Sequence, residues 1–403
     1  MPSKYMLILL TKCHIFKNIW TISPIFVFLH LMKIIIPILF IFFLNFNEVR
    51  ASEDYEERPV SREWQLGGMI HEGRVMKHTY LVSRIIERST TGGEIFLSKQ
   101  TYGKYAWNAF FNYPEYGISY KFSELGNPNY IGNSHCLFPY LNFHLFSNKS
   151  RINLNLRTGA GFAYVEKIFD TKANPLNYAF SQNLNIVLNA QLQGVCKIND
   201  TWSFIAGVEI LHLSNGAYLM PNLGLNNASL FSGISKSFGI KNRLIVPENR
   251  INKKNKIWDF SVFLSGGIKE INPIGGKKYF AGDFNMELTK KHLQYTRFGL
   301  SMDITHDGSE YDCIIFRSLP EVDRLKTTKI GISGGYEWLF GDFSLDLYLG
   351  TYLYEPYSLY GRFYQRTSFR YPLSDRVKLS LTFRNHKGKA DFVGIGFGVR
   401  LTK

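Results

Sequence analysis

Residues 152–164, INLNLRTGAGFAY, place an apolar or small side chain at every second position, with a polar residue or a glycine between most of them. Successive side chains of a β-strand point to opposite faces, so this alternation predicts an amphipathic strand. Residues 184–193, 343–350, 376–384 and 393–401 repeat the pattern. The sequence therefore predicts an all-β chain of antiparallel strands.

Strand length separates two architectures that share this alternation. Soluble β-sandwiches alternate as well, but strands average about 5–6 residues, whereas these segments run about 10–14 residues, enough to cross a bilayer at a tilt. Tyrosine and phenylalanine crowd the segment ends, as in interfacial girdles. Examples are Tyr352, Tyr354, Tyr357, Tyr360, Phe363 and Tyr364. Because an open sheet edge in hydrocarbon leaves backbone groups unpaired, we expect the strands to close into a transmembrane β-barrel.

The sequence leaves the number of barrels open. About eight strand candidates lie before Gly239 and about eight more follow Lys256, so the basic segment between them is the best boundary. One barrel of about 14–16 strands is the simplest prediction, and two tandem eight-stranded barrels are the alternative. The predicted regions are a signal segment (1–51, with 1–31 as an upstream extension), a lead-in (52–74), a first barrel region (75–239), a basic linker (240–255) and additional barrel strands (256–403).

The N-terminal segment has the features of an export signal. Met32 and Lys33 precede the apolar run 34–44, and residues 49–51, Val-Arg-Ala, form an A-x-A-like cleavage site. We expect a cleaved signal peptide, and integration of the barrel into a Gram-negative outer membrane. The formal net charge of +15 favours an anionic contact such as lipopolysaccharide phosphates, with solvated basic loops as the alternative.

One predicted strand ends with two polar side chains on its apolar face. Residues 202, 204, 206, 208 and 210 form that face, and the same period adds His212 and Ser214. A histidine and a serine two positions apart are close enough to share a hydrogen bond, and a serine becomes a nucleophile when a base takes its proton. The turn at Asn215 and Gly216 offers backbone N–H groups to an oxyanion. The alternative is that both side chains mark the membrane–water interface.

This segment resembles the active-site segment of the outer-membrane lipid A 3-O-deacylases, the PagL-type, acyloxyacyl-hydrolase-like family. The matching residues are His212, Ser214, Asn215, Pro221, Asn222 and Gly224. Residues 97–103, 112–117 and 125–128 resemble longer, two-part relatives of that family. The resemblance covers roughly residues 75–238.

The resemblance implies an outer-membrane esterase that removes an ester-linked acyl chain from lipid A. Ser214 would be the nucleophile and His212 the general base, while Asn215 and the main chain of Gly216 and Ala217 would hold the oxyanion. In the short members of the family a glutamate twelve residues after the serine orients the histidine, and here Asn226 stands at that position. An asparagine fixes a histidine tautomer, but it brings no full charge to the imidazolium.

Two other functions remain open. A non-catalytic barrel, such as a porin or a lipopolysaccharide-binding scaffold, suits inner faces that include Arg157, Arg376, Lys378 and Arg384. A phospholipase-like barrel hydrolase would use the same site on a different lipid. Residues 303–312 are acidic enough to bind calcium, but a solvated loop explains them better. We therefore predict no metal and no cofactor. The expected partner is lipid A or another outer-leaflet lipid, no nucleic-acid partner is expected, and the oligomeric state is open.

Overall fold

The computed structural model describes residues 60–77, 79–146, 151–245, 258–271, 274–316, 327–357 and 360–402. The predicted signal peptide (1–51), its extension (1–31) and the part of the predicted linker after residue 245 lie outside these ranges. Within them, no helix is long and apolar enough to cross a membrane.

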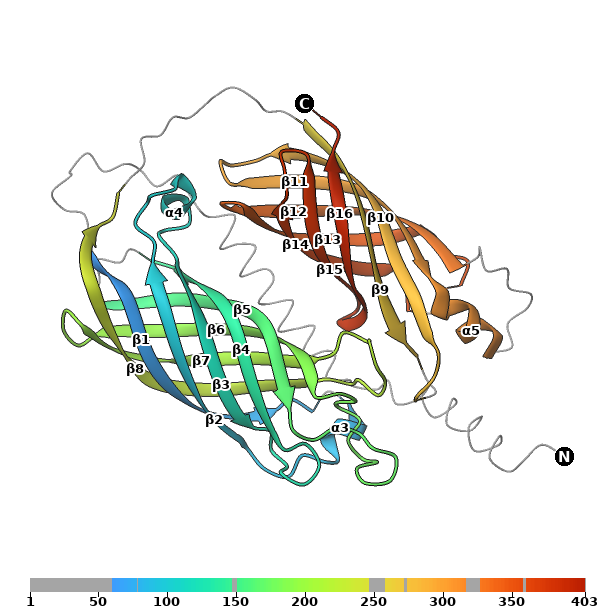
Figure 1. Ribbon diagram of the computed structural model, residues 1–403, viewed down its shortest axis with the longest axis horizontal. Helices are drawn as coiled ribbons and strands as arrows, with labels where there is room; N and C mark the ends of the chain where they lie inside the picture. The colour runs from blue at the N-terminus through green and yellow to red at the C-terminus, as the bar shows by residue number, and fades with distance from the viewer. Residues whose placement is uncertain are drawn as a thin grey trace.

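The described strands form two closed antiparallel barrels of eight strands each (Figure 1). The first barrel contains β1 (Val60–Val75), β2 (Thr90–Gln100), β3 (Glu115–Glu124), β4 (Asn133–His144), β5 (Ile152–Val165), β6 (Leu184–Lys197), β7 (Trp202–Ser214) and β8 (Leu225–Arg243). The second contains β9 (Trp258–Glu270), β10 (Lys278–Lys291), β11 (Thr296–Asp307), β12 (Thr328–Phe340), β13 (Phe343–Tyr354), β14 (Phe363–Pro372), β15 (Val377–His386) and β16 (Lys389–Arg400).

The all-β, antiparallel prediction is confirmed, and the expected single barrel of about 14–16 strands is wrong. β8 pairs with β1 over most of its length, so the first barrel is already closed when the chain reaches β9. β9 then pairs with β16 and closes the second barrel. The tandem alternative is therefore the observed arrangement.

Two element bounds differ from the sequence-based division. Residues 60–75 form β1, although we expected residues up to 74 in a lead-in segment, and β8 continues to Arg243, inside the expected linker. Gly67 and Gly68 interrupt the apolar alternation of β1 and hide its pattern. Among the described residues, three short helices lie in the connections: α3 (Tyr80–Ser83), α4 (Ala106–Phe110) and α5 (Gly308–Phe316).

Both barrels are apolar outside and polar inside. In β5, Ile152 and Phe162 are exposed while Asn155 and Arg157 are buried in the lumen, as the alternation predicts. The outer faces expose a wide set of large apolar side chains, including Leu66, Ile70, Ile118, Leu137, Leu230, Leu264, Ile268, Leu300, Leu349, Ile395 and Phe397. A closed barrel with this outer surface is a transmembrane β-barrel.

Charged networks fill both lumens. In the first barrel, Arg157 Nη2 lies 2.9 Å from Glu94 Oε1. In the second, Arg366 Nη1 donates to Glu287 Oε1 at 2.7 Å, and Arg384 Nη1 donates to Asp283 Oδ1 at 2.8 Å. Burying charges this deeply is tolerated only when they are paired, so these residues plug the barrels rather than line a water-filled pore.

Two tyrosines expected in an interfacial girdle belong to the second lumen. Tyr352 and Tyr364 are 5 % and 2 % exposed. Their hydroxyls bond to His386 Nε2 and to Asp303 Oδ2. Tyr354 and Phe363, by contrast, are exposed. The alternation places Tyr352 and Tyr364 inward, and that parity outweighs their position near strand ends.

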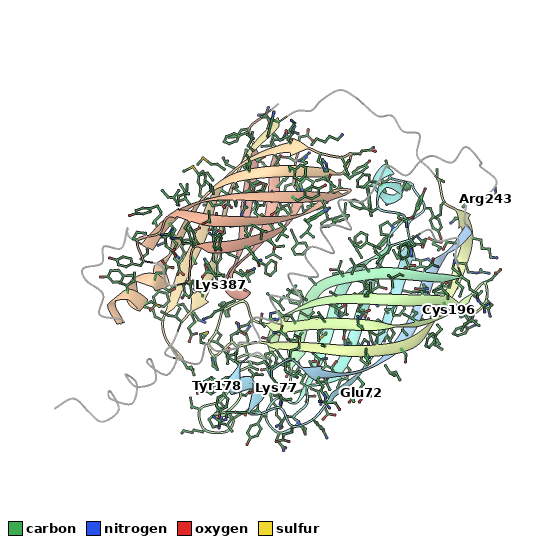
Figure 2. The ribbon with its side chains drawn as sticks, turned by 180° about the vertical axis from the view of Figure 1, so that it is seen from behind. Glu72, Lys77, Tyr178, Cys196, Arg243 and Lys387 are labelled. Carbon is green, nitrogen blue, oxygen red and sulfur yellow. The ribbon has the colours of Figure 1, made fainter. Side chains whose placement is uncertain are left out.

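The two barrels touch at both ends. At the end that holds Cys196 and Arg243 (Figure 2), α4 of the first barrel packs on the β12–β13 turn of the second. The ring centroids of Phe111 and Phe340 lie 4.7 Å apart there. At the opposite end, marked in the first barrel by Lys77 and Tyr178 (Figure 2), the β7–β8 connection meets β9, β10 and β16.

Candidate active site

Strand register brings the three predicted site residues together. β7 pairs with β8 so that His212 lies directly opposite Asn226, and it pairs with β6 so that Ser214 lies opposite Ile186. Directly opposed residues of an antiparallel pair share a face. His212, Ser214 and Asn226 therefore stand together on the outer face at one end of the first barrel, as the alternation predicts.

The three side chains form a continuous hydrogen-bonded chain. His212 Nδ1 lies 2.7 Å from Asn226 Oδ1, and His212 Nε2 lies 2.9 Å from Ser214 Oγ. An amide oxygen only accepts, so Nδ1 is the protonated nitrogen in this arrangement, and Nε2 has its lone pair directed at the serine hydroxyl. This is the tautomer in which a histidine takes a proton from serine.

Gly224 allows the site to be this compact. Its φ is +65°, and a Cβ there would lie 3.3 Å from Ser214 Cβ and 3.4 Å from His212 Cε1. Only glycine adopts this backbone conformation without strain. The N–H of Gly224 donates to Ala179 O at 3.1 Å, which ties the β7–β8 connection to the β5–β6 connection.

The turn after Ser214 has two consecutive residues with positive φ. Gly216 is at +66° and Ala217 at +70°, and Tyr218 N–H donates to Asn215 O at 3.3 Å, which is a type I′ arrangement. A left-handed alanine costs about 1–2 kcal/mol, so the surroundings must hold it. Within the described ranges, the N–H groups of Gly216 and Ala217 donate to no protein acceptor.

The side chain of Asn215 forms hydrogen bonds within the loops around the site. Its Nδ2 donates to Ser181 Oγ at 3.0 Å and to Leu219 O at 2.8 Å, which uses both of its protons. Its main-chain N–H donates to Asn222 Oδ1 at 3.2 Å. Asn215, which we expect among the oxyanion residues, has its side-chain amide and its main-chain N–H bonded within the loop, where they fix the turn. The supporting residue Ser181 has no signal in the sequence.

Glu209 lies in the lumen, on the opposite face from His212, as the strand period predicts. His71, Glu94 and Glu209 are close enough together to bind a metal ion. However, Lys121 Nζ lies 2.9 Å from His71 Nδ1 and also donates to Glu209. The Lys121 ammonium beside Glu209 and the Arg157 guanidinium beside Glu94 supply the positive charge that the two carboxylates require, so the cluster is a structural ion network.

The acidic stretch 303–312 is divided among separate partners. Asp303 accepts from Tyr364 and Ser333, whereas Asp307 accepts from Lys269 Nζ at 2.8 Å. Glu310, in α5, pairs with Lys329, and burial raises the pKa of its carboxyl to about 7. These acids are neutralised by protein groups rather than grouped as a calcium loop would require.

Two family models match the chain. The model for lipid A 3-O-deacylase (PagL) matches residues 91–235, and the model for the acyloxyacyl hydrolase C-terminal domain matches residues 258–403. The first match contains the whole hydrogen-bonded chain of Ser214, His212 and Asn226. The second covers the second barrel, for which the sequence alone suggested only additional strands. No match was found among curated proteins.

Three of the solved structures similar to this chain match it at low identity. The outer membrane enzyme PagL has 16% identity and a TM-score of 0.30, over 41% of this chain and 97% of that one. Neisserial surface protein A (NspA) has 10% identity and a TM-score of 0.29, over 45% and 99%. A Rhodopseudomonas blastica porin has 8% identity and a TM-score of 0.17, over 85% and 100%.

The two family-model matches together span well over half of the chain, and each coincides with one of the two barrels. The chain therefore belongs to the PagL lipid A 3-O-deacylase and acyloxyacyl hydrolase family of carboxylic ester hydrolases.

Proposed function

We propose that the protein is an outer-membrane esterase that removes an ester-linked acyl chain from lipid A by Ser214 and His212 catalysis on the outer surface of the first barrel. The observation that carries the proposal is the hydrogen-bonded chain from Asn226 Oδ1 through His212 to Ser214 Oγ. Membership of the lipid A 3-O-deacylase family supports the substrate and the outer-membrane location.

The first half of the reaction forms an acyl-enzyme. Ser214 Oγ attacks the acyl carbonyl carbon while its proton passes to His212 Nε2. The carbonyl oxygen becomes an oxyanion, which the N–H groups of Gly216 and Ala217 stabilise. When the tetrahedral intermediate collapses, the C–O bond to the sugar breaks, and the His212 proton goes to the leaving alkoxide.

The second half of the reaction releases the fatty acid. His212 takes a proton from water, which attacks the acyl-Ser214 carbonyl, and the acid leaves as the serine regains its proton. Asn226 holds the histidine ring and its tautomer throughout. Because Asn226 is neutral, it stabilises the imidazolium by a dipole alone, and we expect a slower enzyme than one with a carboxylate at this position.

The outer face below the site suits a substrate that stays in the membrane. Ile186 lies opposite Ser214, and Leu188 lies opposite His212 on the same face. Leu188 and Val208 are 40% and 50% exposed. An acyl chain lying along this surface would bury these side chains while its ester reaches Ser214.

A pore function is disfavoured by the two lumens. Arg157 and Arg384, which would line a channel, are each 1% exposed and paired with carboxylates. A phospholipid is the remaining alternative substrate, because the chemistry at Ser214 is the same for any acyl ester.

The purified full chain in detergent, supplied with lipid A and separately with a diacyl phospholipid, tests the proposal. We expect release of a 3-hydroxy fatty acid from lipid A and its loss in Ser214→Ala. Release from the phospholipid alone would redirect the proposal to that substrate, and release by Ser214→Ala at the wild-type rate would overturn the assignment of the nucleophile.

A further inference from the structure

The second barrel contacts the turn that contains the proposed oxyanion donors. The N–H of Glu270, the last residue of β9, donates to Ala217 O at 3.0 Å. Lys278 Nζ, from the first residue of β10, donates to Tyr218 O. Val393 of β16 covers Gly216 so closely that a Cβ at residue 216 would lie 2.4 Å from Val393 Cγ2. The β9, β10 and β16 strands therefore meet one turn of the first barrel.

Contacts within the second barrel hold Glu270 and Lys278 in place. They are directly opposed in the β9–β10 ladder, and Lys278 Nζ lies 2.9 Å from Glu270 Oε2. The other carboxylate oxygen of Glu270 accepts from Gly275 N–H at 2.9 Å and from Gly276 N–H at 3.1 Å. The Lys278 ammonium also lies 4.3 Å from the centroid of the Tyr218 ring. Preorganisation of this kind lets a pair of residues impose a conformation on a neighbour.

The turn needs such support. Ala217 holds a left-handed conformation that an L-residue disfavours. The peptide between Ala217 and Tyr218 is fixed on its N–H side by a 3.3 Å bond to Asn215 O, and on its carbonyl side by Glu270. If that carbonyl were released, Ala217 would no longer be held in its left-handed conformation. Its relaxation would change the dihedral angles of the turn, and with them the directions of the Gly216 and Ala217 N–H groups.

We propose that the second barrel is a positioning element of the esterase site, and that the Glu270–Lys278 pair holds the 215–218 turn with the Gly216 and Ala217 N–H groups directed at the oxyanion. This inference rests on the proposed function. Neither Glu270 nor Lys278 touches the reacting atoms, so both act through the turn.

The inference predicts which kinetic constant changes. Oxyanion donors bind more strongly in the transition state than in the ground state, so their misplacement lowers kcat and leaves KM nearly constant. A lysine that instead bound a substrate phosphate directly would raise KM when removed. The two kinetic constants therefore distinguish the positioning role from direct binding.

The test compares Lys278→Met with the matched control Lys277→Met, both in the full chain. Lys277 is the adjacent lysine, and its ammonium pairs at 3.5 Å with Asp312 rather than with the turn. We expect kcat on lipid A to fall by about tenfold or more in Lys278→Met, with KM within about twofold, since losing one oxyanion donor outright costs about 100-fold or more. We expect Lys277→Met to resemble the wild type, and Lys278→Arg to recover part of the rate because it keeps a donor.

Hydrogen–deuterium exchange of the peptide that spans residues 215–220 gives a second readout that does not require activity. Faster exchange in Lys278→Met than in Lys277→Met supports the proposal. Lys278→Met fails to fold if Glu270 cannot remain buried without its partner. In that case the double variant Glu270→Gln, Lys278→Met, which lacks the unpaired charge, is used in place of Lys278→Met in both measurements.

Several outcomes would overturn the inference. Unchanged exchange, an unchanged kcat, or a rise in KM alone would each contradict a positioning role. A wild-type protein that releases no fatty acid would refute the proposed function instead. In that case the exchange result alone decides whether the second barrel holds the turn.

Discussion

Replacing Asn226 with aspartate tests how the histidine is oriented and charged. Asn226 Oδ1 already lies 2.7 Å from His212 Nδ1, so an aspartate of the same size puts a carboxylate oxygen at hydrogen-bond distance without moving either strand. Within the described ranges, Asn226 Nδ2 donates to no protein acceptor, so the change sacrifices no hydrogen bond. Glutamate, which the short family members use, is one methylene longer and would require a shift of β8.

The expected gain follows from the energies of hydrogen bonds. A hydrogen bond to a charged group contributes about 1.5–3 kcal/mol, against about 0.5–1.5 kcal/mol for a neutral one. The imidazolium forms only on the way to the transition state, so the difference of about 1–1.5 kcal/mol lowers the barrier and raises kcat about tenfold. Asn226→Leu removes the hydrogen bond between His212 Nδ1 and residue 226 at a cost of about 1–3 kcal/mol, which lowers kcat roughly five- to 150-fold.

The assay is fatty acid release from lipid A at saturating substrate, with heat-modifiable gel migration to verify that each variant is folded. The order expected for kcat is Asn226→Asp above wild type and wild type above Asn226→Leu. A folded Asn226→Leu with the wild-type rate would refute the reasoning, because the hydrogen bond to His212 would then contribute nothing. An inactive, folded Asn226→Asp would contradict the claim that the imidazolium lacks charge stabilisation.

Four further outcomes follow from the site and the barrels. His212→Ala should lower acyl release by about 10⁴- to 10⁶-fold with the barrel still folded, and a smaller effect in a rate assay would assign the base elsewhere. Gly224→Ala should lower kcat, because its Cβ would lie 2.9 Å from Leu213 O and 3.3 Å from Ser214 Cβ at a positive φ. Gly194→Ala, with its nearest neighbour at 3.6 Å, should not lower kcat, and equal rates for both variants would contradict the crowding argument. Residues 52–245 expressed alone should form a heat-modifiable barrel with reduced activity, since β1 to β8 close without the second barrel, and an unfolded product would argue against independent closure. The pKa of Glu310 is raised to about 7 from 4.5, so between these pH values the folded state retains a proton that the unfolded state loses. The free energy of unfolding, measured with denaturant, should therefore fall as pH rises from about 4.5 to about 7. Glu310→Gln should show a flatter profile, and an equally steep one would contradict this assignment.

The strand alternation alone predicted the orientation of the proposed catalytic residues correctly. Side-chain parity in a strand is strict, so the pattern from residue 202 onward was enough to put His212 and Ser214 outside and Glu209 inside. In β13 the same rule correctly put Asp346 and Tyr348 on the inner face and Leu345 and Leu347 on the outer face.

Barrel closure could not be predicted in this way. Alternation states which face a side chain occupies but not which strand is its partner, so β8 pairing with β1 rather than β9 leaves no trace in local sequence. β1 itself was missed because Gly67 and Gly68 weaken its apolar pattern.

The contacts between the two barrels could not be predicted from the sequence either. The bonds from Glu270 and Lys278 to Ala217 and Tyr218 join residues more than 50 positions apart and depend on how two closed barrels pack. The engagement of Asn215 by Ser181 is likewise a loop–loop contact that has no periodic signal.

Mass spectrometry of lipid A from cells that express the protein tests the central claim most directly. The account predicts that wild-type expression yields lipid A lighter by one ester-linked 3-hydroxyacyl chain, and that Ser214→Ala, expressed and folded to the same level, leaves lipid A intact. Lipid A that is unchanged by the wild type, or equally shortened by Ser214→Ala, would contradict it.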